Sequence, residues 1–170
     1  TIRNPCNSVR RVLKLLFETG QLHIKPEFFP PKTPEMEATL WQAIQKLAPL
    51  QPRFVSVTYG ADGSTRDRTH RIVSRIAAET GLVSAPHLTC VGSDREEIKA
   101  IARAYRDEGI RHIVALRGDP PQGATEYVPH PGGYPYAVGL VRGLREVADF
   151  DISVAAYPEG HPEVPNADFD

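Results

Sequence analysis

The chain has 170 residues, with 20 Lys and Arg against 21 Asp and Glu and a formal net charge of −1. This near balance argues against a dedicated nucleic-acid or membrane-surface binder, because both classes carry a basic excess. No apolar run approaches the roughly 20 residues of a membrane helix, and Cys6 and Cys90 form neither a disulfide framework nor a CxxC site. We therefore expect a single cytoplasmic domain over residues 1–170.

The first predicted elements are a helix, a strand and a second helix. An amphipathic helix over residues 8–19, part of an extra segment 1–21, precedes a short strand over 22–29. Thr33 can cap the next helix, and Pro34 suits its first turn. The apolar stripe expected to be buried on this helix comprises Met36, Leu40, Ile44 and Leu47. The β-branched and aromatic segment FVSVTYG, residues 54–60, predicts the next strand.

The same alternation continues along the rest of the chain. A third helix should end at Gly81 and bury Ile72, Val73 and Ile76, and a strand PHLTCV follows over 86–91. Ser93 and Glu96 form a predicted capping box for a helix that buries Ile98, Ile101, Ala102 and Tyr105. The last predicted elements are a strand over 112–118, a long polar loop, a helix marked by Ala137, Val141, Leu144 and Ala148, and a strand over 152–158.

Strands joined by single helices predict right-handed crossovers and a parallel sheet. Polar residues follow every predicted strand: Glu27, Thr58, Tyr59, His87, Thr89, Arg117, Asp119, Tyr157 and Glu159. This distribution favours a barrel, in which all such loops converge on one site, over a doubly wound sheet with one switch point. Neither a GxGxxG nor a GxxxxGK[ST] loop supports the doubly wound alternative. We expect an α/β fold of the (βα)8 TIM-barrel type with only about the first five βα units, because a full barrel takes about 250 residues.

Five motifs at consecutive strand ends, PEFFPP, VTYGADGSTRDRT, HLTC, ALRGDPP and AAYPEGHPE, together resemble methylenetetrahydrofolate reductases. The resemblance runs from about Lys25 to Asp170 in matching order. It implies a barrel that binds FAD, takes hydride from NADH or NADPH, and reduces 5,10-methylenetetrahydrofolate to 5-methyltetrahydrofolate. It implies no metal and no nucleic-acid or membrane partner, and a homo-oligomer is left open.

The resemblance also implies roles for single residues. Glu27 would be the general acid for opening the folate ring, kept partly protonated by Phe28, Phe29 and the neighbouring prolines. Asp119 would act beside the flavin and the folate ring. The positions that resemble contacts to FAD or to the nicotinamide donor are Thr58, Tyr59, Ala61, His87, Arg117, Gly118, Asp119, Tyr136, Ala137, Tyr157, His161 and Asp170.

The sequence departs from the family pattern in three places, and two other functions remain open. Lys25-Pro26 predicts a bent or frayed first strand, the loop 120–135 is long, and the second part of the barrel is expected to be absent. One alternative is a metal-dependent barrel hydrolase that uses His87, Asp119, Glu159 and His161. The other is an inactive barrel fragment, or a split subunit that requires a partner carrying the remaining strands.

Overall fold

The computed structural model describes residues 25–59, 65–120, 123 and 127–156. In chain order the elements are β1 (Glu27–Phe28), α2 (Pro34–Leu47), η1 (Ala48–Leu50), β2 (Val55–Val57), α3 (Arg66–Thr80), β3 (Ser84–Thr89), α4 (Arg95–Asp107), β4 (His112–Leu116), α5 (Ala137–Val147) and β5 (Asp151–Val154). The predicted alternation of strands and helices is therefore confirmed. The predicted helix over 8–19 lies outside the described residues.

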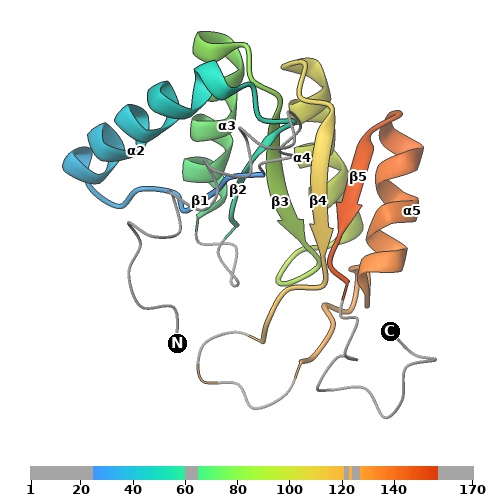
Figure 1. Ribbon diagram of the computed structural model, residues 1–170. Helices are drawn as coiled ribbons and strands as arrows, with labels where there is room; N and C mark the ends of the chain where they lie inside the picture. The colour runs from blue at the N-terminus through green and yellow to red at the C-terminus, as the bar shows by residue number, and fades with distance from the viewer. Residues whose placement is uncertain (1–24, 60–64, 121–122, 124–126, 157–170) are drawn as a thin grey trace.

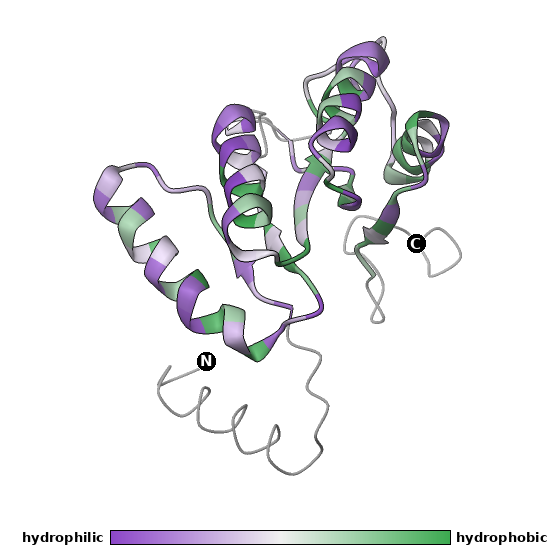
Figure 2. Cartoon of the chain, turned by 90° about the horizontal axis from the view of Figure 1, so that it is seen from above, coloured by the Kyte–Doolittle hydropathy of each residue, from purple (hydrophilic) through white to green (hydrophobic). Residues whose placement is uncertain are grey.

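The strands form a five-stranded parallel sheet in the order β1-β2-β3-β4-β5. A doubly wound sheet would reverse its strand order at a switch point, and this sheet does not. The α-helices follow one another along one side of the strands, as Figure 2 shows from above. Sequential parallel strands with helices on one side are the geometry of an incomplete TIM barrel, as the sequence predicted.

One hydrophobic cluster joins the helices to the sheet. It includes Ile44 of α2, Ile72 of α3, Tyr105 of α4, Leu144 of α5 and the strand residues Val55, Val57, Leu88, Cys90, Ile113 and Ala115. Alternate residues of a strand point to opposite faces. The neighbours of these strand residues, among them Thr58, His87 and Thr89, therefore lie on the face away from the helices. This assignment decides which side chains line the candidate site.

The predicted helix signals are confirmed at Thr33 and Gly81. Two other predictions, the burial of Met36 on α2 and the capping box of α4, are wrong. The Met36 amide donates to Thr33 Oγ1 at 3.3 Å, and Gly81 ends α3 with a left-handed φ of 67°. Met36 itself is 47% exposed, so the buried stripe of α2 begins at Leu40, which packs against the cluster. On α4 the capping box is made by Asp94 and Glu97, one residue later than predicted.

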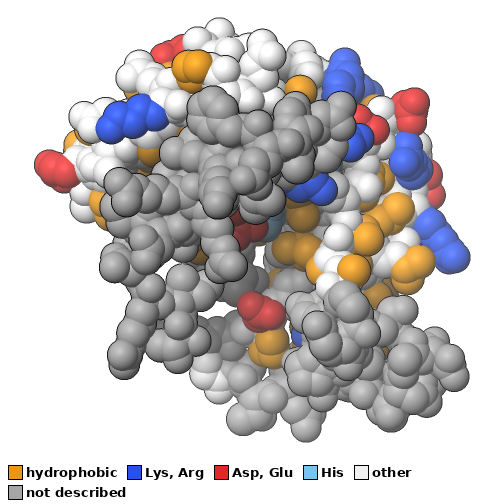
Figure 3. Space-filling model, in the orientation of Figure 1, with side chains coloured by type: hydrophobic (Ala, Val, Ile, Leu, Met, Phe, Trp, Pro, Cys, Tyr) orange, Lys and Arg blue, Asp and Glu red, His pale blue; other side chains and the backbone are white. Residues whose placement is uncertain are grey.

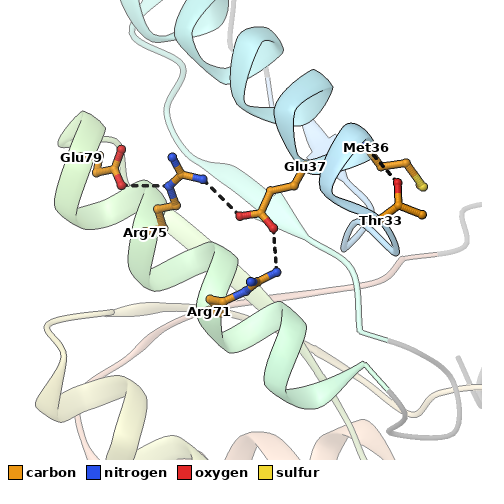
Figure 4. Close-up of polar contacts among 6 residues, drawn as sticks. All are labelled: Thr33, Met36, Glu37, Arg71, Arg75 and Glu79. Carbon is orange, nitrogen blue, oxygen red and sulfur yellow. Dashed lines mark hydrogen bonds and ion pairs between the residues drawn. The ribbon is translucent and has the colours of Figure 1, made fainter.

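Helix α2 is attached to α3 by charged side chains (Figure 4). Glu37 Oε2 accepts from Arg71 at 2.8 Å, and its Oε1 accepts from Arg75 at 3.2 Å. The Arg75 guanidinium also lies 3.8 Å from the centre of the Trp41 ring and pairs with Glu79. A shallow groove beside this bridge lies on the outer layer, and since its polar groups are paired with each other we regard it as helix packing.

All strands run in the same direction, so their carboxyl ends point to one side of the molecule, the lower side of Figure 1. The described residues that follow β4, 117–120 and 127–136, also lie on that side. Within the described residues, no helix combines the length and the apolar character needed to cross a bilayer.

Candidate functional site

Glu27 and His87 meet on the face of the sheet that points away from the helices. Glu27 opens β1 and His87 lies in β3, with β2 between them. Glu27 Oε2 is 3.4 Å from His87 Nε2, and the side chains are 51% and 11% exposed, respectively. Figure 3 shows acidic and histidine side-chain atoms side by side in a hollow of the molecule. The fold thus brings two candidate residues, far apart in sequence, into direct contact.

The expected apolar shield around Glu27 is not what the structure shows. Phe29 is 73% exposed, and Phe28 packs against the hydrophobic cluster. The polar neighbour of the Glu27 carboxylate is the imidazole of His87. Strand β1 is limited to Glu27–Phe28, and the carbonyl of Pro26 accepts from the Ser56 amide at 2.9 Å. This short pairing agrees with the predicted effect of Pro26.

Burial lowers the pKa of His87, and the negative charge of Glu27 partly opposes that shift. Burial therefore favours the neutral form of the His87 imidazole. A neutral imidazole donates from one ring nitrogen and accepts at the other. His87 can consequently pair with Glu27 whether Glu27 is a carboxylate or a carboxylic acid, which suits a group that gives up a proton.

At the end of β2, Thr58 and Tyr59 face opposite sides. Thr58 lies on the face of His87, and its backbone is held by the Phe28 carbonyl and by the Thr69 hydroxyl. Tyr59 belongs to the hydrophobic cluster, and its hydroxyl accepts from Arg66 at 2.9 Å. Arg66 also donates to Ser93 Oγ at 2.6 Å. The Tyr59 side chain thus ties the end of β2 to α3 and to the start of α4, so a contact from Tyr59 to a ligand would use its backbone.

Arg117, Gly118 and Asp119 follow β4. The Arg117 carbonyl accepts from the Cys90 amide at 3.0 Å, which continues the pairing of β3 and β4 past the last strand residue. Gly118 has a φ of +88°, and a Cβ there would lie 2.7 Å from Val91 Cγ2 and 3.0 Å from Thr89 Cβ. Only glycine fits such a conformation at such a close approach. Asp119 is exposed beyond it.

The Arg117 guanidinium lies 4.6 Å from the centre of the Tyr127 ring, and its Nε donates to the Gly118 carbonyl at 3.1 Å. Burial raises the pKa of Tyr127. The cationic group is therefore held over an aromatic ring just after β4, an arrangement that suits contact with an anionic ligand group.

The segment before α5 is anchored by Tyr134. Tyr134 is 7% exposed and lies over Gly139 and Gly143 of α5, and the Arg95 guanidinium lies 5.2 Å from the centre of its ring. Arg95 also donates to the Gly133 carbonyl at 3.2 Å. This anchor fixes Tyr136, which is 60% exposed, and Ala137 at the start of α5.

Other predicted site residues lie outside the described part of the chain: Ala61, Tyr157, His161 and Asp170. The same is true of Glu159 and His161 of the hydrolase alternative. Among the described residues, no three His, Cys, Asp or Glu side chains gather as metal ligands would.

Sequence reasoning noted Thr89 but gave it no role. Thr89 is 5% exposed, and its hydroxyl has no hydrogen-bond partner in the part of the chain that the structure describes. The signal was available in the spacing, since Thr89 follows His87 by two residues in one strand and so shares its face. Tyr127 was likewise overlooked, because the loop around it carries no periodic pattern.

Comparison with known proteins gives one consistent family. Residues 12–170 match the methylenetetrahydrofolate reductase family, beginning earlier than the motifs had indicated. The chain is 56% identical over 153 residues to a 5,10-methylenetetrahydrofolate reductase of Salmonella typhimurium, and it has the same identity to that of Escherichia coli. Each of these alignments covers 89% of this chain and 49% of the relative. It is 40% identical over 158 residues to methylenetetrahydrofolate reductase (NADH) 1 of Arabidopsis thaliana, covering 92% of this chain and 27% of that protein.

The chain therefore spans about half the length of the bacterial relatives. This match over residues 12–170, on a chain whose strands form a sequential parallel sheet, shows that the chain belongs to the methylenetetrahydrofolate reductase family.

Proposed function

We propose that this site serves the flavin-dependent reduction of 5,10-methylenetetrahydrofolate to 5-methyltetrahydrofolate, with NADH or NADPH as the hydride donor. The observation that carries the proposal is the contact between Glu27 and His87 on the inner face of the sheet, which continues through Thr89 to the carboxyl side of the strands. In TIM barrels this side holds the reacting groups. The relatives that support the proposal are named for reduction of the same folate.

Glu27 is the general acid of the proposal. The five-membered ring of the folate must open before hydride can be accepted, and the departing nitrogen needs a proton as the bond breaks. Glu27 projects from the first strand and supplies that proton. His87 Nε2 faces this carboxyl group. The neutral imidazole accepts from the acid in its Nδ1–H tautomer and donates to the carboxylate in its Nε2–H tautomer, so the pair is matched after the transfer only when the imidazole proton moves from Nδ1 to Nε2.

The described residues fit a flavin by their chemistry. Arg117 suits a pyrophosphate, Gly118 brings backbone close to the sheet, and Thr58 and His87 offer hydrogen bonds on its inner face. Bound FAD supplies reversible two-electron storage, which divides hydride transfer into one half-reaction with the nicotinamide and one with the folate. The proposed set is completed by Asp119, Tyr136, Ala137, Tyr59, Ala61, Tyr157, His161 and Asp170.

The first experiment is a visible absorbance spectrum of the purified chain after incubation with FAD and gel filtration. We expect flavin bands to elute with the protein and to bleach when NADH or NADPH is added without oxygen. Protein that elutes colourless would refute the proposal for this chain by itself. A protein that holds flavin but is not bleached by either nucleotide would refute the assigned hydride donor.

A further inference from the structure

We propose that the hydroxyl of Thr89 binds the ligand of this site, through a hydrogen bond to the amide-like edge of a fused heterocyclic ring. The flavin ring and the folate pterin share this chemistry. The inference deepens the proposed function and rests on it. Nothing in the family match or in the strand-end motifs assigns Thr89 such a role.

The first observation is an unsatisfied hydroxyl. Thr89 is 5% exposed, yet its Oγ1 has no partner within the described part of the chain. Buried polar side chains in folded proteins are paired in the large majority of cases, and an exception calls for an explanation. A bound ligand that supplies the missing partner is such an explanation.

The second observation is the direction of the side chain. Leu88 and Cys90, the neighbours of Thr89, belong to the hydrophobic cluster under the helices. Thr89 therefore points to the opposite face, which it shares with His87. His87 contacts Glu27 on that face, so Thr89 lies next to the reacting pair, one step nearer the carboxyl end of β3.

The third observation is a fixed rotamer. A Cβ on Gly118 would lie 3.0 Å from Thr89 Cβ and 3.3 Å from its Cγ2. The methyl group of Thr89 is therefore the part that packs against the Gly118 backbone. Because β-branched side chains have few χ1 choices, this packing holds the hydroxyl in one direction. On β4 the residue in register with Thr89 is Leu116, which offers no polar side chain.

Ser84 provides a contrast within the same strand. Its Oγ is also buried without a partner in the described residues. Ser84 and Leu88 are four positions apart in the strand, so Ser84 faces the helices and lies at the amino end of β3. A partnerless hydroxyl in that position has no access to the site, which makes Ser84→Ala a matched control.

The test compares Thr89→Val, Thr89→Ser and Ser84→Ala with the unmodified chain. Thr89→Val keeps the shape and removes the hydroxyl, whereas Thr89→Ser keeps the hydroxyl and removes the methyl group. Thermal unfolding is measured without ligand, and binding is measured by fluorescence titration with FAD in one arm and 5-methyltetrahydrofolate in the other.

We expect Thr89→Val to unfold at the same or a higher temperature and to bind one ligand about tenfold more weakly. Thr89→Ser should retain affinity within about twofold but unfold at a lower temperature, because it loses the contact with Gly118. Ser84→Ala should leave both affinities unchanged. The arm that weakens in Thr89→Val identifies the flavin or the folate as the partner of the hydroxyl.

Unchanged affinity of Thr89→Val for both ligands would overturn the inference while leaving the proposed function intact. Equal weakening in Thr89→Val and Thr89→Ser would overturn it too, since the methyl group and not the hydroxyl would then matter. If the unmodified chain binds neither ligand, the proposed function fails and the role of Thr89 fails with it.

Discussion

The contact between Glu27 and His87 joins a carboxyl group to an imidazole, and each of these two groups leads to a separate prediction. In the proposed reaction, Glu27 is needed only where a proton must move to the folate. Glu27→Gln keeps the size of the side chain and removes the acid. We expect it to lower the rate of folate reduction by about 10²–10⁴-fold while NADH or NADPH still bleaches the flavin. Rapid-mixing measurements of the two half-reactions would separate these effects.

The matched control for that substitution is Glu96→Gln. Glu96 is 76% exposed and pairs with Arg103 on the surface of α4. It should change neither half-reaction. Equal loss of both half-reactions in Glu27→Gln would contradict the role of Glu27 as a proton donor and would indicate a binding role.

Gly118 is the second residue whose identity the structure explains. Gly118→Ala must place a Cβ 2.7 Å from Val91 Cγ2 at a φ of +88°. A left-handed conformation costs about 1–2 kcal/mol for a residue with a Cβ, and overpacking adds about 1–3 kcal/mol. We expect a loss of about 2–5 kcal/mol in the free energy of unfolding, measured by urea titration.

Gly109→Ala serves as the control because Gly109 has a similar φ of +82° and nothing within 4 Å of its Cβ position. Gly109→Ala should lose only the conformational contribution to the free energy of unfolding, about 1–2 kcal/mol. Equal losses in the two variants would show that the close approach of Gly118 to β3 has no energetic weight.

At the scale of elements, α5 is held by the packing of Tyr134 across two glycines. A Cβ on Gly143 would lie 1.9 Å from the Tyr134 hydroxyl and 2.3 Å from Cζ, whereas a Cβ on Gly139 would lie 3.3 Å from Cδ1. We predict that Gly143→Ala loses about 1–3 kcal/mol of unfolding free energy, although alanine raises helix propensity by about 1 kcal/mol. Denaturant unfolding at constant pH measures the change.

Gly139→Ala is the matched change in the same helix. Its propensity gain should offset a mild contact, so we expect the free energy of unfolding to stay within about 1 kcal/mol of that of the unmodified chain. A loss in Gly139→Ala as large as that in Gly143→Ala would show that both positions, and not the Tyr134 ring at Gly143, limit the packing of α5.

The wrong capping box on α4 is also explained at this scale. Ser93 and Asp94 are both good cap residues with a glutamate three positions later. In the structure the Ser93 hydroxyl accepts a hydrogen bond from the Arg66 guanidinium at 2.6 Å, and Asp94 Oδ1 accepts one from the Glu97 amide at 2.8 Å. The hydroxyl of Ser93 is therefore already bonded to a residue of α3, and Asp94 caps α4 in its place.

For the molecule as a whole, two histidines link stability to pH. Burial lowers the pKa of His87 and of His112, and nearby Glu27 and Asp151 only partly oppose this. The unfolded chain then binds more protons than the folded chain as the pH falls through about 6.5, so unfolding becomes easier. We expect a lower free energy of unfolding at pH 5.5 than at pH 7.5, measured by urea titration.

The control is the pair of single variants His87→Gln and His112→Gln, each of which should reduce the dependence on pH in this window. Glu35 and Glu146 do not contribute there, because hydrogen bonds from Thr33 and Lys99 lower their pKa values from 4.5. Their stabilisation is lost only at more acidic pH. A flat profile between pH 5.5 and 7.5 would contradict the assignment to the histidines.

The sequence by itself determined what depends on near neighbours in the chain. Thr33 and Gly81 signal helix ends, apolar spacing marks the buried faces of α3, and strands alternating with single helices require parallel pairing. The order of polar residues after each strand was enough to predict a barrel and to suggest the family. These features follow from local geometry, so no knowledge of distant contacts is needed.

Only the tertiary structure decided which distant residues meet. It placed His87 and not the phenylalanines beside Glu27, packed Gly118 against Thr89, and left Met36 exposed on α2. Each of these outcomes depends on how β1, β3 and β4 lie in register or on where a helix extends past the sheet. Sequence periodicity indicates on which face of a strand or helix a side chain lies. The residue that it contacts on that face is set by the packing of segments that are far apart in the chain.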